Sequence, residues 1–233
     1  FFKARNKSKH IRDFLMHKSI TNLIEIKREI KSNNLNLKSD IKIIAVSKTF
    51  SIENILPLID YGHTDYGENK VQEAVEKWSE IKNKKTNLNL HMIGKLQTNK
   101  VKQAVKIFDY IHSLDSLKLA KKISEEQIKI KKNLKIFIQI NIGDEIQKSG
   151  IKPEDLSNFY QTCINDFKLN IIGLMCLPPN NLDSSGYFKK MNNLMENLSL
   201  KELSMGMSSD YLTALEHKAT FVRIGSKIFG ERS

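Results

Sequence analysis

The chain of 233 residues has only two cysteines and no long apolar run. Cys163 and Cys176 have neither the paired spacing of a zinc site nor the density of a secreted disulfide scaffold. We therefore expect a cytoplasmic protein in a reducing compartment. No stretch approaches the roughly 18 apolar residues that a membrane-spanning helix needs, so we expect no membrane association.

Aromatic residues are also missing from the basic segments. The net charge of +12 comes mostly from lysines in short clusters, such as KNKK at 82–85 and KIKK at 129–132. A groove for single-stranded nucleic acid interleaves basic and aromatic side chains, so solvated helix faces are the favoured interpretation. Nucleic-acid binding is the alternative, and steeply salt-dependent binding would support it.

Eight short apolar runs are spread along the chain and are typical of parallel strands buried under helices. They are IKIIAVS (41–47), HTDYG (63–67), LNLHMIG (88–94), FDYIHSL (108–114), KIFIQINIG (135–143), LNIIGLM (169–175), KELSMG (201–206) and TFVRIG (220–225).

Amphipathic, lysine-rich segments separate these runs and predict helices, several with a good N-cap residue or a first-turn proline. They cover 51–62, 69–84, 98–107, 116–132, 153–166, 185–198 and 209–218. A long helix from about residue 11 to 32 is expected before the first strand. The basic residues 1–17 form an N-terminal extension of open role, and a remnant of an organellar transit peptide is one alternative.

The alternation of eight strands with helices predicts an α/β fold, a single (β/α)8 TIM-type barrel domain over residues 1–233. A chain of this length can bury the core of one such domain. An open, doubly wound sheet is the alternative, because strand order cannot be read from one sequence. In a barrel, ligand-binding groups gather at the carboxyl ends of the strands.

Lys48 lies at the carboxyl end of the first predicted strand, in IIAVSKTF (43–50). A lysine there is commonly a solvated strand end. It can also form a Schiff base with an aldehyde, if partly desolvated surroundings favour the neutral amine.

Small residues follow the seventh and eighth strands, in SMGMSSD (204–210) and RIGS (223–226). Backbone N–H groups and hydroxyls at the start of the next helices would favour a phosphate, a frequent use of these two loops in barrels. Ordinary turn chemistry, with Ser208 or Ser209 as an N-cap, is the alternative.

Arg223 stands inside the apolar run TFVRIG and needs acceptors for its hydrogen bonds, since an unpaired buried guanidinium is costly. A core carboxylate, Asp65 or Glu68, would serve, and so would a ring nitrogen of a ligand. By contrast, His63, His91 and His112 lack metal-ligand spacing and are interpreted as structural.

Eight motifs occur in an order and at a spacing that resemble the YggS/PROSC family of pyridoxal 5′-phosphate (PLP)-binding proteins, also called PLP homeostasis proteins. The resemblance runs from about residue 20 to 231. The motifs are AVSKT, GENKVQE, HMIGKLQTNK, HSLDS, NIGDEIQKSG, GLMCLPP, SMGMSSDY and FVRIGSKIFG.

The resemblance implies the fold of the N-terminal barrel domain of alanine racemase and a role for each matching residue. Lys48 would hold PLP as a Schiff base, and Arg223 would face the pyridine nitrogen. The other implied cofactor-binding residues are Asn69 near the cofactor, Ser208, Gly225 and Ser226 at the phosphate, and Ser204, Gly206 and Met207 along the same wall.

The implied function is PLP and amino-acid homeostasis without recognised catalytic turnover. An arginine donor keeps the ring nitrogen unprotonated, which weakens the ring as an electron sink. Racemases of the related fold also add a second, β-rich domain that supplies a tyrosine base, and none is expected after Ser233. A weak PLP-dependent racemase or lyase is the alternative. PLP-dependent apo-enzymes are the implied partners, and a monomer is expected.

Overall fold

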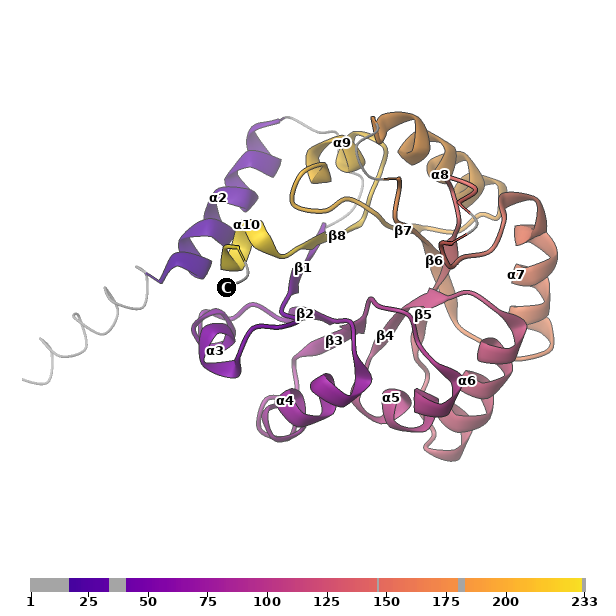
Figure 1. Cartoon of the computed structure of the whole chain (residues 1–233), viewed down its shortest axis with the longest axis horizontal. Helices are drawn as coiled ribbons and strands as arrows, with labels where there is room; N and C mark the ends of the chain where they lie inside the picture. Colours follow the sequence, from indigo (N-terminus) through magenta and orange to yellow (C-terminus); the bar gives the residue numbers. More distant parts are fainter. Residues whose placement is uncertain (1–16, 34–40, 146, 180–182, 232–233) are drawn as a thin grey trace, which may run out of the picture.

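Eight parallel strands close into a barrel in the order β1 to β8, and helices surround it (Figure 1). This computed structural model describes residues 17–33, 41–145, 147–179 and 183–231. Closure confirms the predicted barrel and contradicts the open sheet, because β1 pairs with both β2 and β8. The strands are β1 Lys42–Val46, β2 Asp65–Glu68, β3 Asn89–Met92, β4 Tyr110–Leu114, β5 Lys135–Ile140, β6 Ile171–Cys176, β7 Glu202–Ser204 and β8 Phe221–Ile224.

Every predicted helical segment contains a helix. The α-helices are α2 Lys18–Ser32, α3 Ile52–Asp60, α4 Val71–Lys84, α5 Val101–Ile107, α6 Leu117–Lys129, α7 Leu156–Asn165, α8 Ser185–Asn197, α9 Tyr211–Glu216 and α10 Ser226–Phe229, with short 3-10 helices η1 Thr98–Lys100 and η2 Pro153–Asp155. The predicted start of the first helix, residues 11–16, lies outside the described residues. The four-residue α10 was not among the predicted segments.

The core has an outer and an inner part, as the alternation of side chains along a strand requires. The outer part packs between the strands and the helices. The inner part fills the barrel with Ile44, Tyr110, Phe137, Met175 and Phe221. Several polar side chains are also buried there, which is unusual for a layer that branched apolar residues normally fill.

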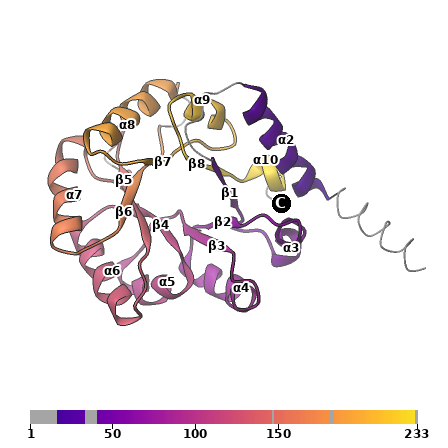
Figure 2. The ribbon, with the colours of Figure 1, turned by 180° about the vertical axis from the view of Figure 1, so that it is seen from behind.

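Helix α2 lies against α10, the helix that begins just after the carboxyl end of β8 (Figures 1 and 2). Asn22 Nδ2 donates to the carbonyl of Ile228 at 2.9 Å, and Lys227 Nζ lies 2.6 Å from Glu29 Oε2. The first described helix therefore fixes the last one, whose first residue belongs to a predicted phosphate loop.

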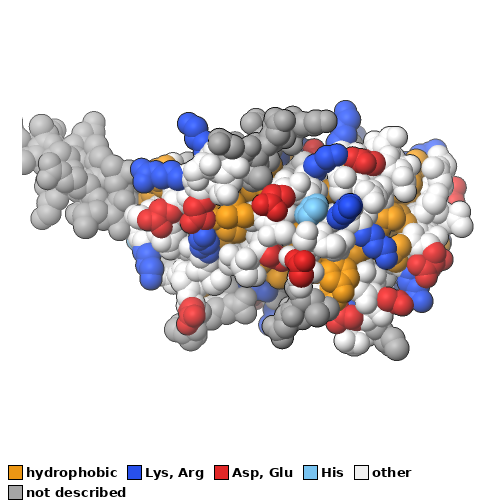
Figure 3. Space-filling model, turned by 90° about the horizontal axis from the view of Figure 1, so that it is seen from above, with side chains coloured by type: hydrophobic (Ala, Val, Ile, Leu, Met, Phe, Trp, Pro, Cys, Tyr) orange, Lys and Arg blue, Asp and Glu red, His pale blue; other side chains and the backbone are white. Residues whose placement is uncertain are grey.

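Charges of both signs are interspersed on the face drawn in Figure 3, where lysines and arginines lie among aspartates and glutamates. Exposed ion pairs such as Lys85 with Asp60 and Lys218 with Glu196 match this pattern. The net charge is thus not gathered in one basic groove on this face, which favours solvated helix faces. A search of the described helices found none long and apolar enough to cross a membrane.

Candidate functional site

A cavity of about 610 Å³ opens at the carboxyl ends of the strands. It brings together seven of the nine residues that the sequence predicted as cofactor-binding. These are Lys48, Asn69, Met207, Ser208, Arg223, Gly225 and Ser226, and the remaining lining residues are Val46, Phe50, Ile93, Gly94, Leu177, Ser209 and Gly230.

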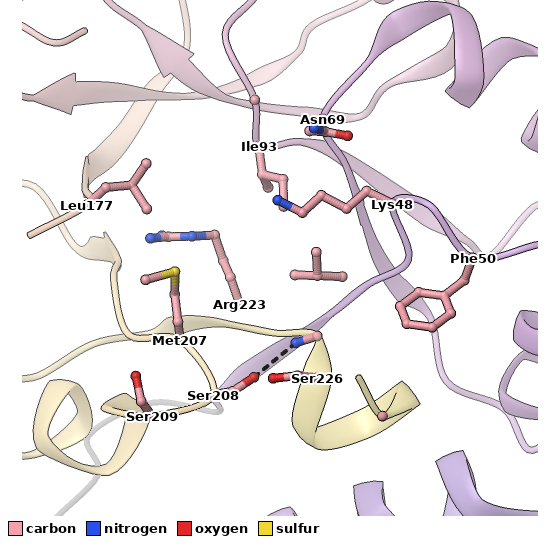
Figure 4. A pocket seen from close by; sticks show the side chains of 14 residues that line it. Lys48, Phe50, Asn69, Ile93, Leu177, Met207, Ser208, Ser209, Arg223 and Ser226 are labelled. Atoms are coloured by element: carbon pink, nitrogen blue, oxygen red, sulfur yellow. Dashed lines mark hydrogen bonds between the residues drawn. The ribbon is translucent and has the colours of Figure 1, made fainter. Parts of the chain in front are cut away.

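Lys48 extends into this cavity from the turn that follows β1, and Arg223 enters from the side of β8 (Figure 4). The turn is tight, because Thr49 has a φ of 70°, in the left-handed region that non-glycine residues rarely adopt. The Thr49 N–H donates to Glu73 Oε1 at 2.8 Å. This hydrogen bond offsets the cost of the left-handed backbone conformation of Thr49 and fixes the direction in which Lys48 leaves the strand.

An ion cluster built around the buried Glu68 lies directly behind that turn. Lys77 Nζ is 3.0 Å from each of Glu68 Oε1, Glu73 Oε1 and the carbonyl oxygen of Ser47. Glu68 is fully buried and also accepts from Ser47 Oγ at 2.7 Å and from Trp78 Nε1 at 3.0 Å. The residue before Lys48 is therefore held through both its carbonyl and its hydroxyl.

Arg223 is 4% exposed, and two of its nitrogen atoms donate hydrogen bonds to protein acceptors. Its Nη1 donates to Ser204 Oγ at 2.6 Å, and its Nη2 donates to the carbonyl of Cys176 at 2.8 Å. The hypothesis of a partner at Asp65 or Glu68 is wrong. Among the described residues no carboxylate forms an ion pair with this guanidinium, because the two acids are bonded to His91 and to the Lys77 cluster.

The loops after β7 and β8 meet at Ser208, as the barrel geometry predicts. Ser208 Oγ accepts from the backbone N–H of Gly225 at 3.3 Å, marked in Figure 4, and from that of Lys227 at 3.4 Å. Ser226 lies beside it. A hydroxyl and converging N–H groups at a helix start form a place where an anion can bind.

Asn69 follows β2 and faces the cavity from the side opposite to Ser208 (Figure 4). Its Oδ1 is buried, and no donor in the described part of the chain reaches it. Since a buried acceptor without a donor is costly, this oxygen is a place where a ligand can donate.

Ser204 and Gly206 lie behind the cavity wall and do not line it. Ser204 is fully buried beneath Arg223. Gly206 has a φ of 89°, and a Cβ there would lie 2.6 Å from the Cβ of Ala214 in α9. Both residues support the wall by holding Arg223 and by letting α9 approach.

The sequence interpretation predicted the apolar lining residue Met207 but missed four others, Val46, Phe50, Ile93 and Leu177. Each follows or ends a strand, so its position gave the available signal. None of His63, His91 and His112 lines the cavity. No group of three or more His, Cys, Asp or Glu residues within the described ranges could hold a metal ion.

The family model of the alanine racemase N-terminal domain matches residues 22–233. A pyridoxal phosphate homeostasis protein from Haemophilus influenzae is 39% identical over 224 residues, covering 91% of this chain and 94% of that relative. This chain belongs to the pyridoxal phosphate homeostasis protein family. The resemblance seen in the eight motifs is thereby confirmed.

Solved structures agree with this family membership. PipY from Synechococcus elongatus, solved with PLP bound, is 32% identical with a TM-score of 0.75, covering 87% of this chain and 99% of PipY. Alanine racemase from Clostridium difficile is 16% identical with a TM-score of 0.71, covering 93% of this chain and 57% of the racemase. The pyridoxal phosphate homeostasis family thus shares its barrel fold with the racemase.

Proposed function

We propose that this chain binds PLP in the cavity through Lys48 and serves PLP and amino-acid homeostasis without catalytic turnover. The observation that carries the proposal is the convergence of Lys48, Arg223 and the Ser208 loops on one cavity. PLP supplies an aldehyde that condenses with amines and a ring that withdraws electrons. The names of the relatives and the PLP bound to PipY support the same ligand.

The phosphate would be held by Ser208, Gly225 and Ser226. The two N–H groups that now reach Ser208 Oγ and the hydroxyls of Ser208 and Ser226 are donors suited to a dianion. This wall carries no carboxylate among its cavity-lining residues, so nothing described there would repel the negative charge.

The aldehyde would react with Lys48. In that step the amine nitrogen and the aldehyde carbon form a C=N bond, and the aldehyde oxygen leaves as water. The bonded turn behind Lys48 favours the step because it holds the side chain in the direction of the cavity.

Arg223 supports a holding role rather than a catalytic one. Guanidinium is a donor only and keeps its proton in proteins, so a ring nitrogen facing it accepts a hydrogen bond and stays unprotonated. An unprotonated ring withdraws electrons weakly, which disfavours reactions through a carbanion.

Absorption of the protein as isolated, before and after borohydride, tests the proposal. We expect a visible band that borohydride bleaches, together with a PLP-sized mass increase on the peptide that contains Lys48. Lys48→Ala should lose both signals. Lys70→Ala, which removes an exposed lysine next to Asn69, should keep both. Retention of the band and of the reducible adduct in Lys48→Ala would refute the assignment.

A second candidate is a weak PLP-dependent racemase or lyase, favoured by the fold shared with alanine racemase. Incubation of single-enantiomer amino acids in deuterated water separates the two functions. Deuterium at Cα above the rate with free PLP would support catalysis, whereas incorporation at that rate supports the holding role. Delivery to apo-enzymes and the monomeric state stay predictions.

A further inference from the structure

A chain of hydrogen-bonded polar side chains crosses the interior of the barrel. Asp65 Oδ1 lies 3.1 Å from His91 Nε2, and His91 Nδ1 lies 3.0 Å from His112 Nε2. His112 Nδ1 lies 2.8 Å from Ser204 Oγ, which also accepts from Arg223. All five residues are buried. We call Asp65, His91, His112 and Ser204 the barrel relay.

The relay begins at a carboxylate. Burial alone would raise the pKa of Asp65, but hydrogen bonds from His91 and Thr64 and the charge of Lys42 hold this pKa below its usual range. An ionised carboxylate only accepts, so the proton of His91 must be on Nε2. Burial lowers the pKa of His91, which keeps the ring neutral and makes its Nδ1 an acceptor.

The same logic fixes the remaining protons. His112 must donate from Nε2 to His91 Nδ1. Burial lowers the pKa of His112 well below its usual value, so its Nδ1 is an acceptor as well. The hydroxyl proton of Ser204 then points to His112 Nδ1, and the serine oxygen is left to accept from Arg223. Every donor in the chain therefore points from Arg223 toward Asp65.

Both imidazole rings are also fixed by stacking. His91 stacks on Tyr110 at 4.2 Å between centroids, and His112 stacks on Phe137 at 4.3 Å. Phe221 meets both imidazoles edge-on. Apolar residues would fill these positions without a desolvation cost. The two imidazole rings therefore do more than fill space: their fixed orientation holds the hydrogen bonds of the relay in place.

We propose that the barrel relay positions Arg223 for the ring of the bound cofactor and places the counter-charge of the guanidinium at the far end of the barrel. The inference rests on the proposed function, because Arg223 is the group that would meet the ring nitrogen. Ser204 and the Cys176 carbonyl fix two amino groups of the guanidinium and thus its plane. The negative end of the Ser204 hydroxyl dipole faces the guanidinium of Arg223, and the relay ends at the ionised carboxylate of Asp65.

Nitrogen-15 NMR of the histidines in the ligand-free protein tests the proton arrangement without any variant. We expect His91 and His112 each to be neutral at pH 7, with the proton on Nε2 and an unprotonated Nδ1. A proton on Nδ1 of either ring, or a doubly protonated ring, would overturn the relay.

The effect on Arg223 is tested with Ser204→Ala and His112→Phe. Ser204→Ala removes the acceptor of Nη1, so we expect the Kd for PLP to rise about tenfold, the typical effect of losing a hydrogen bond to a charged group. The absorption band should shift, while the borohydride adduct on Lys48 persists. His112→Phe keeps the stack on Phe137 and should shift the band in the same direction.

Two control variants separate positioning from general damage. Ser204→Thr retains a hydroxyl and should restore the wild-type Kd and band. His217→Gln changes a histidine that bonds Ser185, away from the relay, and should leave the band in place. Wild-type spectra and Kd in both test variants would contradict the proposal. A wild-type protein with no adduct on Lys48 would refute the proposed function instead, and the NMR result would still decide the relay.

Discussion

Gly94 and Asn69 touch so closely that no side chain fits between the β3 loop and the β2 loop. A Cβ on Gly94 would lie 2.4 Å from the carbonyl oxygen of Asn69 and 2.7 Å from its Cβ. Both residues line the cavity, and no donor from the described residues reaches the buried amide oxygen of Asn69. The contact therefore sets how far Asn69 reaches into the cavity.

Gly94→Ala should push the Asn69 backbone away and weaken both the fold and the site. Overpacking of this kind typically costs about 1–3 kcal/mol of unfolding free energy, and we expect the Kd for PLP to rise as well. Urea unfolding and a PLP titration measure the two effects. Gly186→Ala is the matched control, because a Cβ there meets nothing within 4 Å. Equal stability of the two alanine variants would contradict the steric argument.

Lys77 is the cation on which the turn at Lys48 depends. Lys77→Met would leave Glu68, fully buried, and Glu73 without their cation. Removal of one partner from a buried pair typically destabilises a protein by about 3–5 kcal/mol. We also expect slower formation of the borohydride-reducible adduct, since the carbonyl of Ser47 loses its donor. Denaturant unfolding and stopped-flow absorption after mixing with PLP check the two effects.

Lys85→Met provides the comparison for Lys77. Lys85 pairs with Asp60 in solvent, with exposures of 41% and 52% for the two side chains. Exposed pairs contribute about 0–1 kcal/mol, so this variant should be nearly wild type in both measurements. A Lys77 variant that behaves like the Lys85 variant would show that the cluster does not hold the turn.

The sequence predicts the barrel and the location of its site for one physical reason. Parallel strands all end on the same side, so Lys48, Asn69 and Ser208, far apart in the chain, had to meet there once eight strands were identified. The depth of a side chain is a different matter. Ser204 and Met207 are three residues apart, yet only Met207 lines the cavity, because the layer that a residue occupies depends on strand tilt and register.

The sequence likewise could not predict which buried polar side chains form hydrogen bonds with each other inside the barrel. Asp65 was a reasonable candidate for Arg223 by charge, but two histidines and Ser204 lie between them along the relay. Periodicity places a residue inside the barrel and does not say which neighbour it meets across the axis. The short helix α10 escaped prediction because four residues carry too little periodicity to be recognised.

Both cysteines should be inert in the folded protein. Burial raises the pKa of the Cys163 and Cys176 thiols to about 12, so almost no thiolate is present near neutral pH. A chromogenic disulfide reagent at pH 8 should report no rapid reaction in native protein and two thiols after unfolding in guanidinium. Rapid labelling of either cysteine in buffer alone would show that its surroundings open readily.

His63 should contribute to the loss of stability in acid; its Nε2 donates to the carbonyl of Asp65 at 3.0 Å. Burial lowers the pKa of His63 to about 4, against about 6.5 in an unfolded chain. Between these values the unfolded state binds more protons than the folded state. The contribution of His63 to the unfolding free energy is therefore fully present above pH 6.5 and is lost as the pH drops toward 4. The difference between the two pKa values of His63 corresponds to at most about 3 kcal/mol of unfolding free energy.

His63→Gln isolates this contribution, because the glutamine amide can donate to the same carbonyl and does not titrate. Urea midpoints at pH 7 and pH 4.5 should fall less in the variant than in the wild type. Part of the acid loss should remain in the variant, because burial also lowers the pKa of His91 and His112, so both take up protons more readily in the unfolded chain. The chosen window stays above the ordinary pKa of aspartate, so protonation of Asp65 does not enter. Parallel profiles for the two proteins would mean that His63 takes up its proton without loss of the fold.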